Sequence, residues 1–269
     1  MNRLNSSVKR LLQNGGDDFS PIRLPDEFTM QEIPLEGLAA YWLSISRALS
    51  GKKGSRFLQG ELQHVREPYL RHLLEIGFSS FTSEQIRRFA SIKKATILSD
   101  LKRKLFLMLI ALMGIYNKEN PQQILIRIIS RFPISPVLEK EVFQKAQELL
   151  ELVELGNGPA KELISVDHSM EAHDFIVNLI FYTMLSRRQG WEACGPFISD
   201  IRSPLFAEGL SLIIDRFDYD FIKHRLNLQK NEILQDSEIK MDMAMEMCIG
   251  IREDMAYEDL LRIAHSFML

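Results

Sequence analysis

Apolar residues recur at helical spacing along much of the chain. Ile86, Ala90, Ile97, Leu101 and Leu105 lie four or seven residues apart, which places their side chains on one face of an α-helix. Residues 218–247 show the same periodicity, although less regularly. The sequence lacks the sustained alternation of apolar and polar residues that is typical of strands. We therefore predict an all-α protein.

The chain contains an internal repeat. Residues 49–115 align without a gap with residues 185–251, at an offset of 136 positions. Fifteen of these 67 positions are identical, among them Phe81/Phe217 and Lys94/Lys230. Self-similarity over such a length is typical of a copied supersecondary unit. The alignment therefore predicts two tandem helical repeats.

Helix-start signals occur at matched places in the two repeats. Pro68 and Pro204 suit the first position of a short helix, because a backbone N–H at that position would have no partner within the helix and proline has none. Thr82 and Asp218 are N-cap residues that precede a long apolar pattern. Each repeat is thus predicted to contain a short proline-started helix followed by a helix of roughly 33 residues, about 50 Å long. Two matched glycines near the far ends of these long helices are Gly114 and Gly250.

Turn-forming residues divide the chain into three parts. The sequence GNGP at 156–159 is typical of a linker. We expect residues 34–155 to form the first helical repeat and residues 156–269 to form the second. Residues 1–33 contain a Gly-Gly pair and two prolines, and we expect them to be a flexible N-terminal arm.

Composition and charge narrow the functional class. Hydrophobic residues make up 46% of the chain, which excludes global disorder. The formal net charge of -3 lacks the basic excess of a nucleic-acid binder. The most apolar stretch, residues 105–115, is about half the length that a membrane-spanning helix needs. Cys194 and Cys248 are too few for a disulfide framework or a four-Cys zinc site. With no apolar run typical of a signal peptide at the N-terminus, we expect a cytoplasmic protein.

Catalytic signals are weak. The sequence contains no Walker A, dinucleotide-binding, HExxH or GxSxG motif, so we expect no catalytic residues, no cofactor and no metal site. His173 and Asp174 form an HD dipeptide of the kind that helical metal phosphohydrolases use, but no further ligands are spaced to converge on them. The alternative interpretation is a polar helix start, where Asp174 is favourable in the first turn.

Basic clusters and methionines are candidates for partner binding. Basic clusters such as residues 102–104 are interpreted as a solvated helix face, with docking of an acidic partner and nucleic-acid binding as alternatives. Four methionines alternate with other residues between 241 and 247. Methionine packs adaptably in cores and recurs at binding surfaces, and copper binding is a third possibility. We take Met243 and Met247 as the candidates for an exposed apolar strip.

The second repeat resembles the cytoplasmic region of MotA-type flagellar stator proteins, of the family that includes ExbB and TolQ. The similarity covers residues 175–235, and residues 40–100 show a weaker echo. Its members are the segments 187–191 (RRQGW), 203–206 (SPLF), 209–210 (GL), 213–215 (IID) and 226–232 (LNLQKNE), together with Asp218 and Ile222. In that family the long helix continues into a membrane span, whereas here it stays short. The resemblance thus implies a soluble duplicate of the part that engages the flagellar switch, and no channel.

The resemblance also implies where a partner would bind. Charged residues of this helix pair contact the switch protein in the family. The nearest matches here are Arg202, Glu208, Asp215 and Arg216. Arg216 replaces a glycine of the family. We expect a non-enzymatic protein–protein interaction module that docks through helix faces to flagellar switch or stator components, with no nucleic-acid partner and no membrane span. The alternatives are a HEAT-like adaptor with an unrelated partner and an HD-type metal phosphohydrolase.

Overall fold

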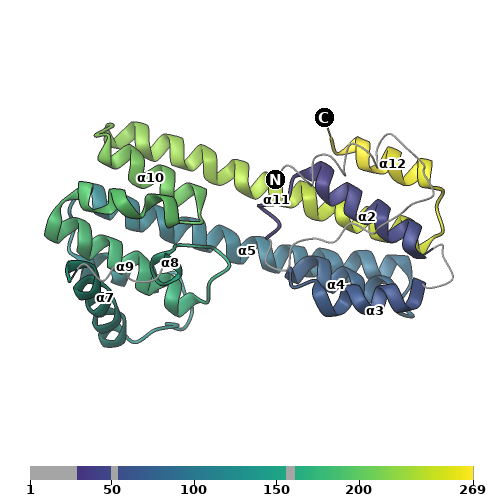
Figure 1. The fold of residues 1–269 in the computed structure, drawn as a ribbon, viewed down its shortest axis with the longest axis horizontal. Helices are drawn as coiled ribbons and strands as arrows, with labels where there is room; N and C mark the ends of the chain where they lie inside the picture. Colours follow the sequence, from purple (N-terminus) through teal and green to yellow (C-terminus); the bar gives the residue numbers. More distant parts are fainter. Residues whose placement is uncertain (1–28, 50–53, 156–160, 269) are drawn as a thin grey trace. The chain divides into compact units, whose positions relative to one another are not determined.

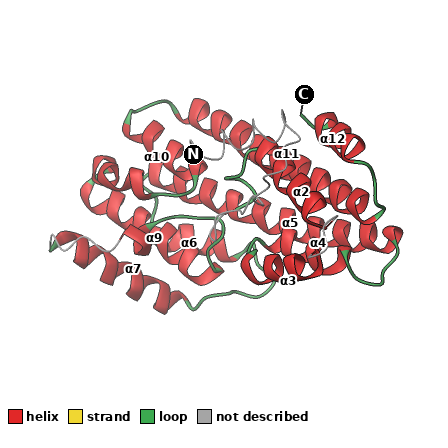
Figure 2. Ribbon diagram, turned by 45° about the vertical axis from the view of Figure 1, so that its right-hand side comes forward, coloured by secondary structure: helices red, strands yellow, loops and turns green. Residues whose placement is uncertain are grey.

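The structure is a computed structural model that describes residues 29–49, 54–155 and 161–268. Throughout these residues the chain is all-α, and no strand occurs among them (Figure 2). The predicted fold class is confirmed. None of the helices in this described part combines the length and the apolar character needed to cross a bilayer.

Two helices of 34 residues dominate the chain (Figure 1). Each follows a short helix that begins at one of the matched prolines, as the repeat alignment predicts. The helices in chain order are α2 (Leu35–Leu49), α3 (Gly54–His64), α4 (Pro68–Gly77), α5 (Ser83–Tyr116), α6 (Pro121–Ile129), α7 (Glu139–Glu154), α8 (Lys161–Ile164), α9 (Ala172–Gln189), the 3-10 helix η1 (Trp191–Asp200), α10 (Pro204–Ile214), α11 (Tyr219–Arg252) and α12 (Tyr257–Ser266).

The chain folds into two compact units, and both use parts of the two long helices. Unit 1 comprises Met1–Ser99 and Ile233–Leu269, and unit 2 comprises Asp100–Glu232. The boundary therefore falls inside α5 and inside α11. The predicted division at 156–159 follows the order of the sequence, whereas the compact units cut across it. That linker and residues 1–28 of the predicted arm lie outside the described residues, while Met30 and Ile33 are buried.

Side-chain caps explain where α4 and α10 begin. The carboxylate of Glu67 accepts a hydrogen bond from the N–H of Leu70 at 2.7 Å, one residue before the proline that opens α4. At the matched position, the hydroxyl of Ser203 accepts from the N–H of Phe206 at 3.4 Å. Both caps satisfy a backbone donor that the helix itself leaves unpaired.

The two long helices also begin at side-chain caps. Thr82 and Gln85 form a reciprocal capping box, in which each side chain accepts from the other's backbone N–H, at 3.2 and 2.9 Å. Asp218 caps α11 by accepting from the N–H of Phe221 at 2.9 Å. The residues that the sequence marks as N-caps therefore occupy equivalent settings.

The core of unit 1 surrounds α2. Residues 38–45 have no exposed surface at all, although they include a tyrosine, a tryptophan and a serine. The N-terminal half of α5 and the C-terminal half of α11 contribute to the same core, for example through Ile86 and Met241. A helix that is buried on every side is necessarily apolar all round rather than on one stripe.

The core of unit 2 surrounds α9 in a similar way. Residues 175–183 are all buried, and α7, α6 and η1 pack against this helix. The C-terminal half of α5 supplies Leu105, Met108 and Leu112 to unit 2, all buried. The apolar stretch 105–115 is therefore a core helix segment.

A lysine of each long helix binds backbone carbonyls that precede the buried central helix of its unit. In unit 2, Lys104 Nζ donates to the carbonyls of His168 and Met170 at 2.7 and 2.9 Å, and pairs with Asp100 at 3.2 Å. These carbonyls precede α9, so their partner must come from elsewhere in the fold.

The matched lysine of unit 1 makes the same kind of contact. Lys240 Nζ donates to the carbonyl of Met30 at 3.2 Å and to that of Gln31 at 3.4 Å, just before α2. It pairs with Asp236 at 2.6 Å, and the lysine is itself buried. Removing it would leave a buried carbonyl without a donor.

We predict that Lys240→Met destabilises the protein. The substitution keeps the aliphatic stem but deletes the donor to Met30, so the free energy of unfolding should fall by about 2 kcal/mol. Urea denaturation followed by circular dichroism measures the change. Lys140→Met, on the exposed start of α7, is the control and should change stability by less than about 0.5 kcal/mol. Equal effects of the two substitutions would contradict the prediction.

We predict that Glu67 makes unit 1 less stable as the pH rises. Burial raises the pKa of Glu67 from 4.5 to about 7, against the lowering effect of the N–H groups of Leu70 and Tyr69. Between these two values the folded chain holds a proton that the unfolded chain has released, so stability declines as pH increases through this window.

Glu67→Gln retains an acceptor for the N–H of Leu70 and removes the titration. From about pH 5 to about pH 8, the wild type should therefore lose on the order of 1–3 kcal/mol more stability than the variant. Denaturation midpoints measured across this range test the difference. Parallel pH profiles for the two proteins would show that Glu67 does not titrate in this window.

Candidate protein-binding surface

The turn between α10 and α11 brings two of the predicted partner-binding residues together. Asp215 ends α10 and is exposed. Arg216 follows in the left-handed backbone conformation, with φ of 61°, and 75% of its side chain is exposed. Its guanidinium pairs with Glu192 of η1 at 3.1 Å. A backbone N–H and the Arg216 guanidinium both lower the pKa of Glu192.

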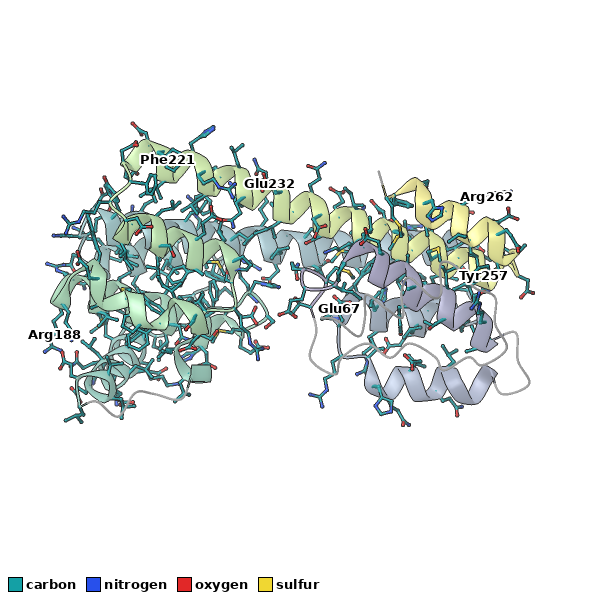
Figure 3. The ribbon with its side chains drawn as sticks, turned by 45° about the horizontal axis from the view of Figure 1, so that its top comes forward. Glu67, Arg188, Phe221, Glu232, Tyr257 and Arg262 are labelled. Carbon is teal, nitrogen blue, oxygen red and sulfur yellow. The ribbon has the colours of Figure 1, made fainter. Side chains whose placement is uncertain are left out.

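Two exposed phenylalanines extend this turn onto α11. The rings of Phe217 and Phe221 stack with their centroids 5.1 Å apart and their planes 22° apart. Each residue is nearly half exposed, at 43% and 45%, and Phe221 is labelled at the start of α11 in Figure 3. We refer to Asp215, Arg216, Phe217 and Phe221 as the turn surface.

An aromatic cluster holds the turn surface in place. Trp191 donates its indole N–H to the carbonyl of Ile115 at 3.0 Å. Tyr116 stacks on the same indole at 5.6 Å between centroids, and its ring also lies 5.5 Å from that of Tyr219. The end of α5, the start of η1 and the start of α11 are thereby tied together, which fixes the backbone of the turn.

The other two predicted charged residues lie away from the turn. Arg202 is exposed before the start of α10 and lies 4.0 Å from Asp167. Since α10 rises about 1.5 Å per residue, Arg202 and Asp215 are at opposite ends of the helix. Glu208 accepts two hydrogen bonds from the Arg225 guanidinium, at 2.8 and 3.4 Å, so it is already engaged within unit 2.

The predicted methionine strip is not a surface. Met243 and Met247 are 0% exposed and belong to the core of unit 1. Their places as partner-contact residues are therefore corrected to core packing, the other interpretation that the sequence allowed. The acids interleaved with them face α5 instead, where Asp242 pairs with Lys94 and Glu246 pairs with Arg87.

The residues proposed from the sequence do not include the exposed phenylalanines, although the spacing of apolar residues along α11 indicates them. Ile222 and Leu226 are buried and define the inward face of α11. Phe217, Phe221 and Leu228 lie roughly 100–140° away from Ile222 around the helix at 100° per residue. Apolar residues this far from the buried stripe indicate an exposed patch.

Unit 1 exposes a similar patch at the start of α5. Phe81 and Phe89 are about one-third exposed, and their rings meet edge to face at 5.1 Å. Ile92 is more exposed still. Phe81 and Ile92 occupy the positions of Phe217 and Leu228 in the repeat alignment.

The structure also describes residues on which other chemistries would depend. His173 contacts the adjacent Asp174 at 2.9 Å, and no group of three or more His, Cys, Asp or Glu side chains among the described residues is placed to hold a metal ion. Cys194 and Cys248 are both buried, and burial raises the pKa of each thiol to about 12. At neutral pH neither is a reactive thiolate.

No protein-family model matches the chain, and no curated protein or solved structure is significantly similar to it.

We predict that Arg216→Gly stabilises the protein. Glycine adopts positive φ without the steric penalty that other residues incur, so the free energy of unfolding should rise by roughly 0.5–1 kcal/mol. Chemical denaturation measures the change. Arg216→Ala is the control, because it removes the exposed contact with Glu192 but keeps the strained backbone. An equal gain from alanine would show that strain at this position is not the cause.

Proposed function

We propose that the chain is a non-enzymatic protein-binding module and that the turn surface is one of its contact sites. The observation that carries this proposal is the stacked, exposed pair of Phe217 and Phe221. Large exposed aromatic side chains are enriched at the centre of protein interfaces, where they contribute most of the binding energy. The adjacent charges of Asp215 and Arg216 would set the orientation of the partner and the association rate.

The resemblance to MotA-type stator proteins suggests the class of partner. It covers residues 175–235, which include the turn surface, and the glycine of the family is replaced by Arg216. The left-handed conformation of Arg216 is one that favours glycine, which supports the alignment at this point. We propose a flagellar switch or stator component as the partner, in the cytoplasm.

We propose in addition that the two halves of the chain arose by duplication. Support comes from helix ends as well as from helix starts. A Cβ added at Gly114 would meet Ile124 at 2.4 Å, and one added at the matched Gly250 would meet Leu260, 136 positions after Ile124, at 2.7 Å. Two long helices thus end with the same close approach to the helix that follows.

We predict that Phe217→Ser/Phe221→Ser abolishes partner capture. Cross-linking in the cells that make the protein, followed by mass spectrometry, should recover the partner with at least about tenfold lower yield, as expected for the loss of interface aromatics. The matched control is Leu152→Ser/Leu155→Ser, which removes two other exposed apolar side chains of unit 2 and should leave the yield unchanged.

The identity of the captured protein separates the alternatives. A stator or switch component supports the motor proposal. A different protein that depends on the two phenylalanines keeps the binding module but favours the unrelated adaptor. Recovery that is the same in both double variants contradicts the assignment of the turn surface.

A further inference from the structure

Unit 2 carries two lysines on different long helices. Lys102 is exposed on α5, and Lys230 is partly buried on α11. Burial and the charge of Lys102 both lower the pKa of Lys230. Lys230 Nζ donates to the side-chain oxygen of Asn227 at 2.8 Å, and in the part of the chain that the structure describes neither lysine pairs with a carboxylate.

One of the two matched positions of unit 1 carries the opposite charge. There Lys94, the counterpart of Lys230, pairs with Asp242 at 2.7 Å and with Glu238 at 3.4 Å. Glu238 is the counterpart of Lys102 at the offset of 136. Unit 1 thus neutralises its lysine within the fold, whereas unit 2 places a second cation where unit 1 has a carboxylate.

Two arginines of unit 2 lie over aromatic rings, and one of these rings, that of Phe106, is four residues after Lys102 on α5. The guanidinium of Arg131 lies 4.4 Å above the ring of Phe106, which is the counterpart of Asp242. The guanidinium of Arg103 lies 5.0 Å above the ring of Phe132. Stacking on a ring holds the Arg131 guanidinium at a fixed angle and leaves its edge able to bind a carboxylate with two hydrogen bonds. Arg103 differs, because it already pairs with Asp100 at 2.5 Å. We refer to Lys102, Arg131 and Lys230 as the basic face.

An apolar side chain follows the basic face in sequence. Ile134, two residues after Phe132, is 85% exposed. Charges together with an exposed aliphatic residue fit an amphipathic partner better than they fit a small anion.

We propose that the basic face docks an acidic amphipathic helix of a partner protein. The glutamates or aspartates of that helix would pair with the lysines of the basic face, as Glu238 and Asp242 pair with Lys94 in unit 1. Its apolar residues would contact Ile134. Nucleic acid fits less well, because the two rings are covered by guanidinium groups and cannot stack on bases. Unit 2 also contains more acidic than basic residues, which opposes a polyanion.

The test titrates the full chain against a fluorescein-labelled synthetic helix of about 20 residues, with leucines on one face and glutamates on the other. Fluorescence anisotropy gives the affinity. Lys102→Glu should weaken binding at least about tenfold. It also gives Lys230 the internal carboxylate that Glu238 gives Lys94, so the variant should fold. Lys140→Glu makes the same charge change on the exposed start of α7 and should alter affinity less than about twofold.

Several outcomes would overturn the proposal. One is the absence of peptide binding to the wild type, and another is an equal loss of affinity in Lys102→Glu and Lys140→Glu. A third is tighter, Lys102-dependent binding of single-stranded RNA or of phosphatidylserine vesicles, which would assign the face to phosphates. Lys102→Gln, which removes the charge without adding an acid, repeats the comparison if Lys102→Glu does not fold. Because the basic face contains none of the turn-surface residues, its failure leaves cross-linking through Phe217 and Phe221 untouched.

Discussion

Each long helix divides its apolar surface between the two units, and the rest of the structure depends on this division. The first half of α5 buries Ile86 in unit 1, and its second half buries Met108 in unit 2. The helix α11 runs in the opposite order, with Ile222 in unit 2 and Met247 in unit 1. Burial of these side chains is the dominant favourable contribution to folding, so each unit needs residues from both halves of the sequence. A helix of 34 residues is long enough to serve two cores, and two such helices make each unit dependent on distant parts of the chain.

The sequence specifies the helices well because their ends are encoded locally. Proline at the first position of α4 and α10 and the capping box of Thr82 are properties of neighbouring residues, and they can be recognised without tertiary information. The same holds for the inward face of each helix, which the spacing of apolar residues reveals. Periodicity indicates which face of a helix is buried, but it does not indicate which segment of the chain packs against that face. The sequence therefore does not predict that α5 and α11 are shared between two units. The linker at 156–159 suggests a sequential division instead.

Prediction of the candidate sites from the sequence is limited in the same way. The sequence indicated the turn around Asp215 and Arg216 through a resemblance, and the structure places both residues on the surface. The sequence does not distinguish Met243 and Met247 from surface residues, because alternating methionines are equally compatible with a core and with an interface. The phase of α11 decides between them. Met243 lies roughly 60° around the helix from the inward-facing Ile222 and Met247 roughly 20°, whereas Phe217 and Phe221 lie roughly 140° and 100° away.

The two units share a plan for their interiors and differ in the charges around it. Lys104 and Lys240 both bind carbonyls that precede a buried helix, and a lysine that satisfies buried acceptors cannot change without cost. Lys94 and Lys230 are under no such constraint, since they contact side chains near the surface. In unit 1 the surrounding residues are acidic and the charge is neutralised internally. In unit 2 the residues at the matched positions are basic or aromatic, and among the described residues neither Lys102 nor Lys230 pairs with a carboxylate. Since the matched positions lie on long helices in both units, this difference in charge pairing comes from side-chain identity at a few surface positions.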